Sequence, residues 1–136
     1  MKLTTRRQAR ELALQILFQT EFAPQISIHT FLELYEQSME PDVRDYADGL
    51  IRGVQAHLQA IDSKIQSSSA HWKVERMATI DRNILRIAVY EIAFAKDPVQ
   101  PGIVINEAVE IAKRYGTTES ASFVNGLLDQ VAKGHS

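Results

Sequence analysis

Residues Ile80–Ala95 read IDRNILRIAVYEIAFA and form the most apolar helical pattern of the chain. Thr79 precedes them as a candidate N-cap, and Asp81 lies in the first turn, where a helix favours acidic side chains. Apolar residues then recur on most sides of the expected helix: Ile84, Leu85, Ile87, Ala88, Val89, Ile92, Ala93 and Phe94. A helix that is apolar on most of its sides belongs at the centre of a bundle. We therefore predict an all-α fold built around this segment.

Helical periodicity continues on both sides of this segment. The other expected helical segments are Thr5–Phe22, a short helix capped by Ser27, Pro41–Ile65, a short turn at Trp72–Met77, Ile103–Tyr115 and Thr117–Lys133. Residues 41–65 carry one apolar stripe at helical spacing, so we expect a single unbroken helix there. No strand-like alternation and no repeat is present. The chain is therefore expected to be one domain, residues 1–136, folded as a bundle of six to seven helices.

The composition is that of a globular domain rather than a disordered chain. The chain has 136 residues and no cysteine, which excludes disulfides, thiolate metal sites and cysteine nucleophiles. No apolar run approaches the length of a membrane span. The N-terminal residues lead straight into arginines, without the apolar core of a signal peptide. We therefore expect a cytoplasmic protein.

The charge is unevenly distributed around a net value of −2. The charged residues within 21–62 are mostly acidic, whereas the basic residues of the N-terminal end are Lys2, Arg6, Arg7 and Arg10. Cations at an exposed helix start cost roughly 0.3–1 kcal/mol each, because that end of a helix carries partial positive charge. We therefore expect these arginines to be exposed and to bind an external anion. A solvated, slightly frayed helix start is the plain alternative.

The sequence holds no constellation of residues for catalysis or metal binding. No histidine stands at the spacing of a metal motif. Glu107 and Glu110 form a Glu-x-x-Glu pair, but a carboxylate metal site in a bundle needs Glu-x-x-His and a second such helix. Glu110 is instead placed to pair with Arg114 four residues later. There is no glycine-rich phosphate loop and no serine elbow, so we expect a protein that is not an enzyme and that needs no cofactor or metal.

Nucleic acid is the better candidate ligand. Phe18 follows Arg10 by just over two helical turns and is placed to stack on an unpaired base, with core packing as the alternative. Arg82 and Arg86 share one face of the central helix, where an arginine needs a carboxylate partner or an anionic ligand. The helix start at Thr117–Ser122 offers backbone N–H groups to a phosphate, with plain N-capping as the alternative.

Four blocks of the sequence resemble the bacterial NusB transcription antitermination family, in the order in which that family has them. The blocks are Arg6–Phe18 (RRQARELALQILF), Asp81–Glu91 (DRNILRIAVYE), Ile105–Lys113 (INEAVEIAK) and Phe123–Asp129 (FVNGLLD). The resemblance implies a two-lobed helical bundle that binds the boxA segment of nascent RNA. It also implies a heterodimer with NusE, the small-subunit ribosomal protein, within an RNA polymerase complex that resists termination on ribosomal RNA operons. It leaves open whether the free protein is a monomer or a homodimer.

The resemblance also implies which residues contact RNA. By motif match they are Arg6, Arg7, Arg10, Phe18, Arg86, Glu119, Ser122 and Phe123. The chain departs from some members at two of these positions, where those members have a tyrosine in place of Phe18 and a lysine in place of Ser122. Stacking survives the first change, whereas a phosphate contact at Ser122 becomes weaker.

Two other functions compete with this interpretation. A similar helical domain precedes the catalytic domain of some RNA cytosine methyltransferases, but a chain of 136 residues has no room for that second domain. The other alternative is a helical protein-interaction module with no role in RNA binding. A salt-dependent titration with single-stranded RNA separates this second alternative from an RNA-binding protein.

Overall fold

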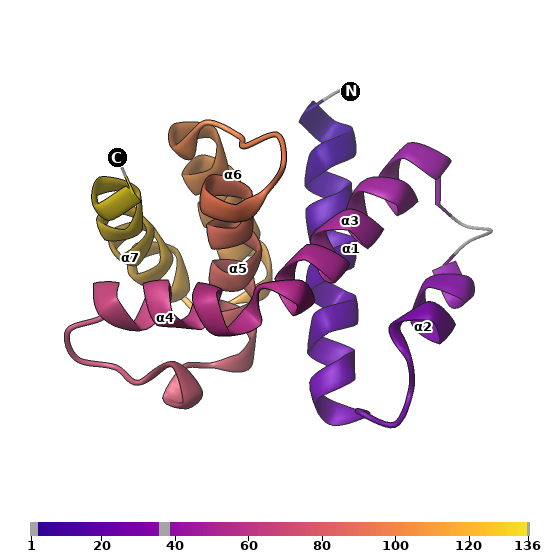
Figure 1. Ribbon diagram of the computed structural model, residues 1–136, viewed down its shortest axis with the longest axis horizontal. Coiled ribbons are helices and arrows are strands. Elements are labelled where there is room, and N and C mark those ends of the chain that lie inside the picture. Colours follow the sequence, from indigo (N-terminus) through magenta and orange to yellow (C-terminus); the bar gives the residue numbers. More distant parts are fainter. Residues whose placement is uncertain (1–2, 36–38, 136) are drawn as a thin grey trace. The chain divides into compact units, whose positions relative to one another are not determined.

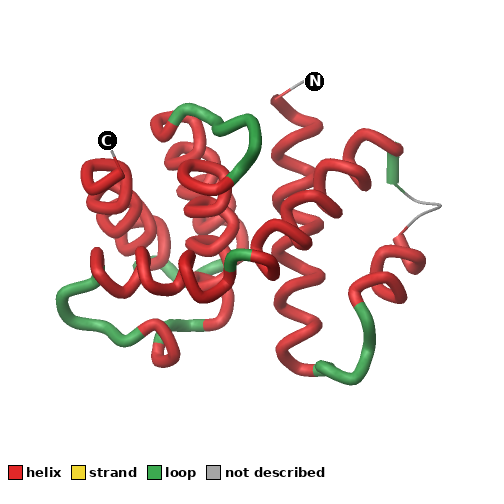
Figure 2. Tube along the Cα trace, viewed as in Figure 1, coloured by secondary structure: helices red, strands yellow, loops and turns green. Residues whose placement is uncertain are grey.

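The computed structural model describes residues 3–35 and 39–135 and is helical throughout (Figures 1 and 2). Its elements are α1 (Leu3–Phe22), α2 (Ile28–Tyr35), α3 (Pro41–Ala56), α4 (Leu58–Ser68), a 3-10 turn η1 (Val74–Arg76), α5 (Thr79–Val89), a π-helical turn η2 (Tyr90–Phe94), α6 (Pro101–Tyr115) and α7 (Ser120–His135). In this part of the chain there is no strand, and none of the helices has the length and hydropathy of a membrane span. The predicted all-α fold is confirmed. Lys2, one of the basic residues of the N-terminal end, lies outside the described residues.

The chain divides into two compact units, residues 1–52 and 53–136. The first unit contains α1, α2 and most of α3, and α2 packs against α1. Its buried apolar side chains include Leu12, Ile16, Phe31, Leu32, Val43, Leu50 and Ile51. Ser27 caps α2 as predicted, because the backbone N–H of Thr30 donates to Ser27 Oγ at 3.1 Å.

The second unit is built around α5, which contacts α4, α6 and α7 (Figure 1). Leu85 and Val89 of α5 are completely buried, and Ile84, Ile87 and Ala88 are nearly so. This confirms that the segment apolar on most sides is central to its bundle. The start of α5 differs in detail from the prediction. Thr79 is already helical, and Ala78 is the N-cap without a side-chain hydrogen bond.

The prediction of a single helix over residues 41–65 is wrong, because the structure has two helices there, α3 and α4, which are separated at His57. His57 leaves helical geometry with φ −117° and ψ 21°, and its ring stacks on Phe94 with centroids 5.1 Å apart. The ring of Tyr90 fills the space where a Cβ of Gly53 would stand. The break between α3 and α4 thus depends on contacts with η2, which is distant from it in sequence. The sequence around the break gives no sign of it, because the apolar stripe continues and no proline is present.

The end of the central helix also differs from the prediction of a plain α-helix up to Ala95. The Ala95 backbone N–H donates to the Tyr90 carbonyl at 2.8 Å, five residues back instead of four. The Glu91 carbonyl, which an α-helix would pair with Ala95, accepts the N–H of Val99 at 3.2 Å. The wider turn therefore joins the helix to the loop that leads into α6.

Candidate nucleic-acid interface

The arginines at the start of α1 are engaged within their own unit. The Arg6 guanidinium lies over the Tyr46 ring, 5.4 Å from its centroid, which places a residue of α3 beside α1. Arg6 Nε is buried and has no hydrogen-bond partner. Arg7 is half-buried and also interacts with other groups of the protein. Part of this basic surface is therefore used within the unit, where Arg6 lies against the Tyr46 ring of α3.

Arg10 is buried, with only 3% of its surface exposed, so the expectation that it stands on an exposed helix start is wrong. The reason lies in the neighbouring turns, because Leu14 and Leu17 share its face of α1 and are buried as well. The spacing of Arg10, Leu14 and Leu17 is visible in the sequence, but the prediction took the apolar face of this helix to run through Ala9, Leu12 and Ile16. Arg10 interacts with other groups of the protein, which a buried charge requires.

An aromatic pair stands at the other end of α1. Phe18 is half-buried and its ring lies 4.7 Å from that of Phe22, at a tilt of 47°. Phe22 is 69% exposed and is the more accessible ring of the two. Sequence reasoning chose Phe18 and missed Phe22, although the two residues stand four apart on one helix face. Arg6, Arg7, Arg10 and Phe18 thus lie along a single helix.

Arg86 of α5 has the carboxylate partner that its position required. Its Nε and Nη2 donate to the two carboxylate oxygens of Asp62 in α4, each at 2.9 Å. The pair is largely shielded, since only 14% of the Arg86 side chain is exposed. This fork geometry fixes α4 against α5. The structure therefore gives Arg86 a packing role within its unit, and a contact with RNA stays a prediction.

The start of α7 is an ordinary capping turn. The Thr117 N–H donates to Ser120 Oγ at 2.9 Å, and the Glu119 N–H donates to Thr117 Oγ1 at 3.4 Å. Gly116 precedes this turn because a Cβ there would collide with the Ser120 side chain. The helix accordingly begins at Ser120 instead of Thr117. These hydroxyls occupy backbone donors, which favours capping over phosphate binding at this turn.

Two of the predicted contact residues meet in a hollow of about 370 Å³ beside this turn. Phe123 of α7 and Glu119 just before α7 line it on one side. Trp72 and Arg76 line it from the chain between α4 and α5, and Asp81 lines it from the first turn of α5. We call it the Trp72 hollow. Ser122 is exposed on α7 and does not line it. Sequence reasoning missed Trp72, whose signal was a lone tryptophan in a polar stretch.

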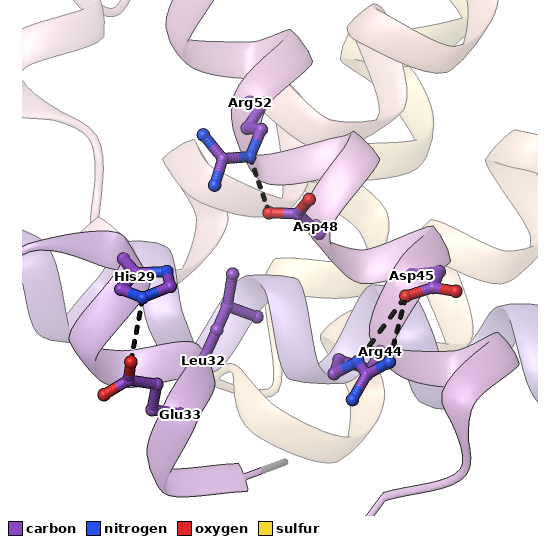
Figure 3. Close-up of a pocket in the computed structure, with 7 residues that line it drawn as sticks. All are labelled: His29, Leu32, Glu33, Arg44, Asp45, Asp48 and Arg52. Atoms are coloured by element: carbon purple, nitrogen blue, oxygen red, sulfur yellow. Dashed lines mark hydrogen bonds and ion pairs between the residues drawn. The ribbon is translucent and has the colours of Figure 1, made fainter.

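A second hollow, of about 170 Å³, lies in the first unit between α2 and α3 (Figure 3). Its charged side chains pair with one another, as Figure 3 shows. His29 Nε2 lies 2.8 Å from Glu33 Oε1, and Arg52 Nε lies 2.8 Å from Asp48 Oδ1. Arg44 and Asp45 make a longer contact of 3.5 Å. Because these charges already have partners, this hollow is the weaker candidate for a binding site.

Comparison with known proteins gives one consistent result. The model of the NusB family matches residues 7–133. The transcription antitermination protein NusB of Bdellovibrio bacteriovorus is 74% identical, over 99% of this chain and 100% of that protein. The solved structure of NusB from T. maritima has a TM-score of 0.86 at 39% identity, and the match covers 96% and 92% of the two chains. A chain of the crystal structure of antitermination factors NusB and NusE with double-stranded RNA has a TM-score of 0.82 at 28% identity, and that match covers 98% and 99%.

Proposed function

Because the chain belongs to the NusB family, we propose that it is a transcription antitermination factor that binds boxA-type single-stranded RNA together with NusE. Its place of action is the cytoplasm, in a complex with RNA polymerase on nascent transcripts, notably those of ribosomal RNA operons. The whole chain, residues 1–136, acts as one RNA-binding domain, and the family match over residues 7–133 supports this because it spans both units. The family is one of antitermination factors and not of enzymes.

The observation that carries the proposal is a structural likeness to one chain of the crystal structure of NusB and NusE with RNA. The match covers nearly the whole of this chain and of that chain. That complex holds double-stranded RNA, whereas we propose a single-stranded ligand. The preference for single strands is supported by exposed aromatic rings at Phe22 and Trp72, since such rings stack on unpaired bases. Competition between a boxA strand and the same strand in a duplex tests it. A duplex that competes as well as the single strand would contradict this preference.

The RNA-contacting residues of this proposal are those that the family resemblance implied, Arg6, Arg7, Arg10, Phe18, Arg86, Glu119, Ser122 and Phe123. Their exposure divides them into residues that can contact RNA directly and residues that position a helix. Arg7, Glu119 and Ser122 have accessible surface for a direct contact, whereas Arg10 and Arg86 are shielded and act mainly by holding their helices in place. A homodimer of the free protein is a further proposal, and sedimentation of the chain without NusE tests it.

Arg7→Ala is expected to weaken RNA binding without unfolding the protein. Each phosphate contact on a single strand contributes about 0.7 to the slope of log K against log salt, so the slope should fall by somewhat less than one unit. Titration of labelled boxA RNA at several salt concentrations measures this slope. Arg52→Ala is the matched control, since Arg52 is an exposed arginine of the same unit that pairs with Asp48. Equal slopes for both variants and the parent would show that the basic start of α1 is not the RNA site.

Saturating NusE is expected to tighten the binding of RNA to this chain. The basic surface of α1 is small and the chain is acidic overall, so RNA affinity without NusE should be modest. By linkage, RNA must tighten the protein–protein contact by the same factor, and a coupling of about 1–3 kcal/mol would be ordinary. The test is an RNA titration at fixed salt with and without NusE. Identical affinities in the two titrations would mean that the two ligands bind independently.

A further inference from the structure

Trp72 is the single tryptophan of the chain and is 57% exposed. It stands in the loop between α4 and η1 and lines the Trp72 hollow together with Phe123. Tryptophan is usually well covered in folded proteins, because its ring is the largest apolar side chain. A ring left in water at the edge of a hollow that a second aromatic also lines is a platform for a flat ligand.

Hydrogen bonds hold the backbone of this platform in place. The Trp72 carbonyl accepts hydrogen bonds from Ser69 Oγ at 2.7 Å and from Gln66 Nε2 at 3.1 Å. The oxygen of the same amide, Gln66 Oε1, accepts the N–H of Val74 at 3.0 Å. Gln66 therefore fastens the loop to α4 at Trp72 and again at Val74. A platform that is already ordered loses little entropy when a ligand stacks on it.

The following turn is held from the side of α5. Arg82 Nη1 lies 3.4 Å from the carbonyl oxygens of Val74, Glu75 and Met77. These contacts connect η1 to the helix whose first turn contributes Asp81 to the hollow. The aromatic and acidic sides of the hollow therefore belong to one fixed framework. Its volume of about 370 Å³ lies in the range of sites for small ligands.

The charges in the hollow select the part of the RNA that it can take. Its charged lining residues are Asp81, Glu119 and Arg76, so carboxylates outnumber guanidinium groups. Asp81 Oδ1 is buried, so a ligand does not reach this oxygen, whereas Glu119 is exposed. An acidic hollow disfavours a phosphate and favours an N–H donor. Among base edges, exocyclic amino groups are the donors that aspartate and glutamate accept, as with the amino group of cytosine.

We propose that the Trp72 hollow receives one unpaired base that carries an exocyclic amino group, stacked on Trp72 and Phe123 with the amino group directed to Glu119. The hollow thus selects cytosine or adenine over uracil at one position of the bound strand. This proposal rests on the proposed RNA-binding function and adds to it a base preference and a contact residue, Trp72.

The lone tryptophan allows a direct test with the unmodified chain. We would titrate the protein with short single-stranded RNAs of equal length made only of cytidine, adenosine or uridine. Trp72 emission reports the hollow, and the anisotropy of end-labelled RNA reports binding at any site. We expect cytidine and adenosine strands to quench Trp72 and to bind several-fold more tightly than the uridine strand.

Variants then separate stacking from hydrogen bonding. Trp72→Leu keeps an apolar side chain but removes the aromatic face, and should weaken binding of the cytidine strand about 5- to 150-fold, as the loss of one stacked base does. Trp72→Phe should restore most of that affinity. Glu119→Gln should lower the ratio of cytidine to uridine affinity. Glu110→Gln is its control, since Glu110 is an exposed glutamate near Lys113 on α6.

Each outcome either supports or overturns the proposal. RNA binding seen by anisotropy, with unchanged Trp72 emission and an unaffected Trp72→Leu variant, would overturn the role of the hollow and leave the proposed function standing. Equal affinity for cytidine and uridine strands would overturn the base preference. A response of Trp72 to NusE and not to RNA would assign the hollow to a protein partner instead. If the parent protein binds none of these strands nor boxA RNA, the proposed function itself fails.

Discussion

Ile87→Asp is expected to unfold the second unit under conditions in which the parent chain is folded. Ile87 is buried in α5, and α5 contacts α4, α6 and α7. An ionised carboxylate without a partner at such a position costs several kcal/mol. A domain is stable by only about 5–15 kcal/mol in total, so this change removes a large part of its stability. Urea and thermal unfolding followed by circular dichroism measure the loss.

The matched control is Ile103→Asp. It makes the same chemical change at an exposed position in the first turn of α6. An acidic residue is favourable at the start of a helix, so this variant should be about as stable as the parent. If Ile87→Asp melted within a few degrees of Ile103→Asp, α5 would not be the centre of the second unit.

Asp62→Ala is expected to destabilise the protein by about 1–3 kcal/mol, because the shielded Arg86 guanidinium loses two charge-assisted hydrogen bonds. Asp48→Ala is the comparison, since Asp48 also pairs with an arginine Nε, at 2.8 Å. The difference is exposure, as 61% of the Arg52 side chain is exposed against 14% for Arg86. An exposed pair contributes less than about 1 kcal/mol. Midpoints of urea unfolding compare the two variants.

The same experiment addresses the role of Arg86 in RNA binding. If Arg86 mainly holds α4 against α5, then Asp62→Ala and Arg86→Ala should lower stability by similar amounts, and the double variant should cost less than their sum. If Arg86 contacts RNA directly, Arg86→Ala should weaken RNA binding, whereas Asp62→Ala should not. Equal stability losses for Asp62→Ala and Asp48→Ala would contradict the structural role of the shielded Arg86–Asp62 pair.

Much of the fold could be predicted from the sequence because its signals are local. Apolar spacing placed helix over the regions that are helical, although α3 and α4 were expected as one helix, and the hydroxyl of Ser27 identified the start of α2. The division between α3 and α4 could not be found in this way. It depends on Tyr90 and Phe94, which are far from Gly53 and His57 in sequence and meet them only after folding.

The candidate site was predicted less completely, for a similar reason. Residue type and motif position indicated Phe123 and Glu119, which line one hollow. They gave no measure of exposure, so Arg10 was expected on the surface, and the more exposed Phe22 was passed over in favour of Phe18. Trp72 was missed because the features that make it a candidate come from its surroundings. The ring has an ordered backbone and an aromatic neighbour from α7, and neither is visible in a linear sequence.

The π-helical turn at Tyr90–Phe94 limits which changes in chain length this protein can accept. Surface loops usually tolerate insertions and deletions, but the loop before α6 is tied to the turn by the bond from Val99 N–H to the Glu91 carbonyl. Removing one residue from the turn would restore the α-helical pattern and give that carbonyl back to the helix. It would also rotate every following position by about 100°. Evolution can therefore vary side chains in this segment more freely than it can vary the number of residues.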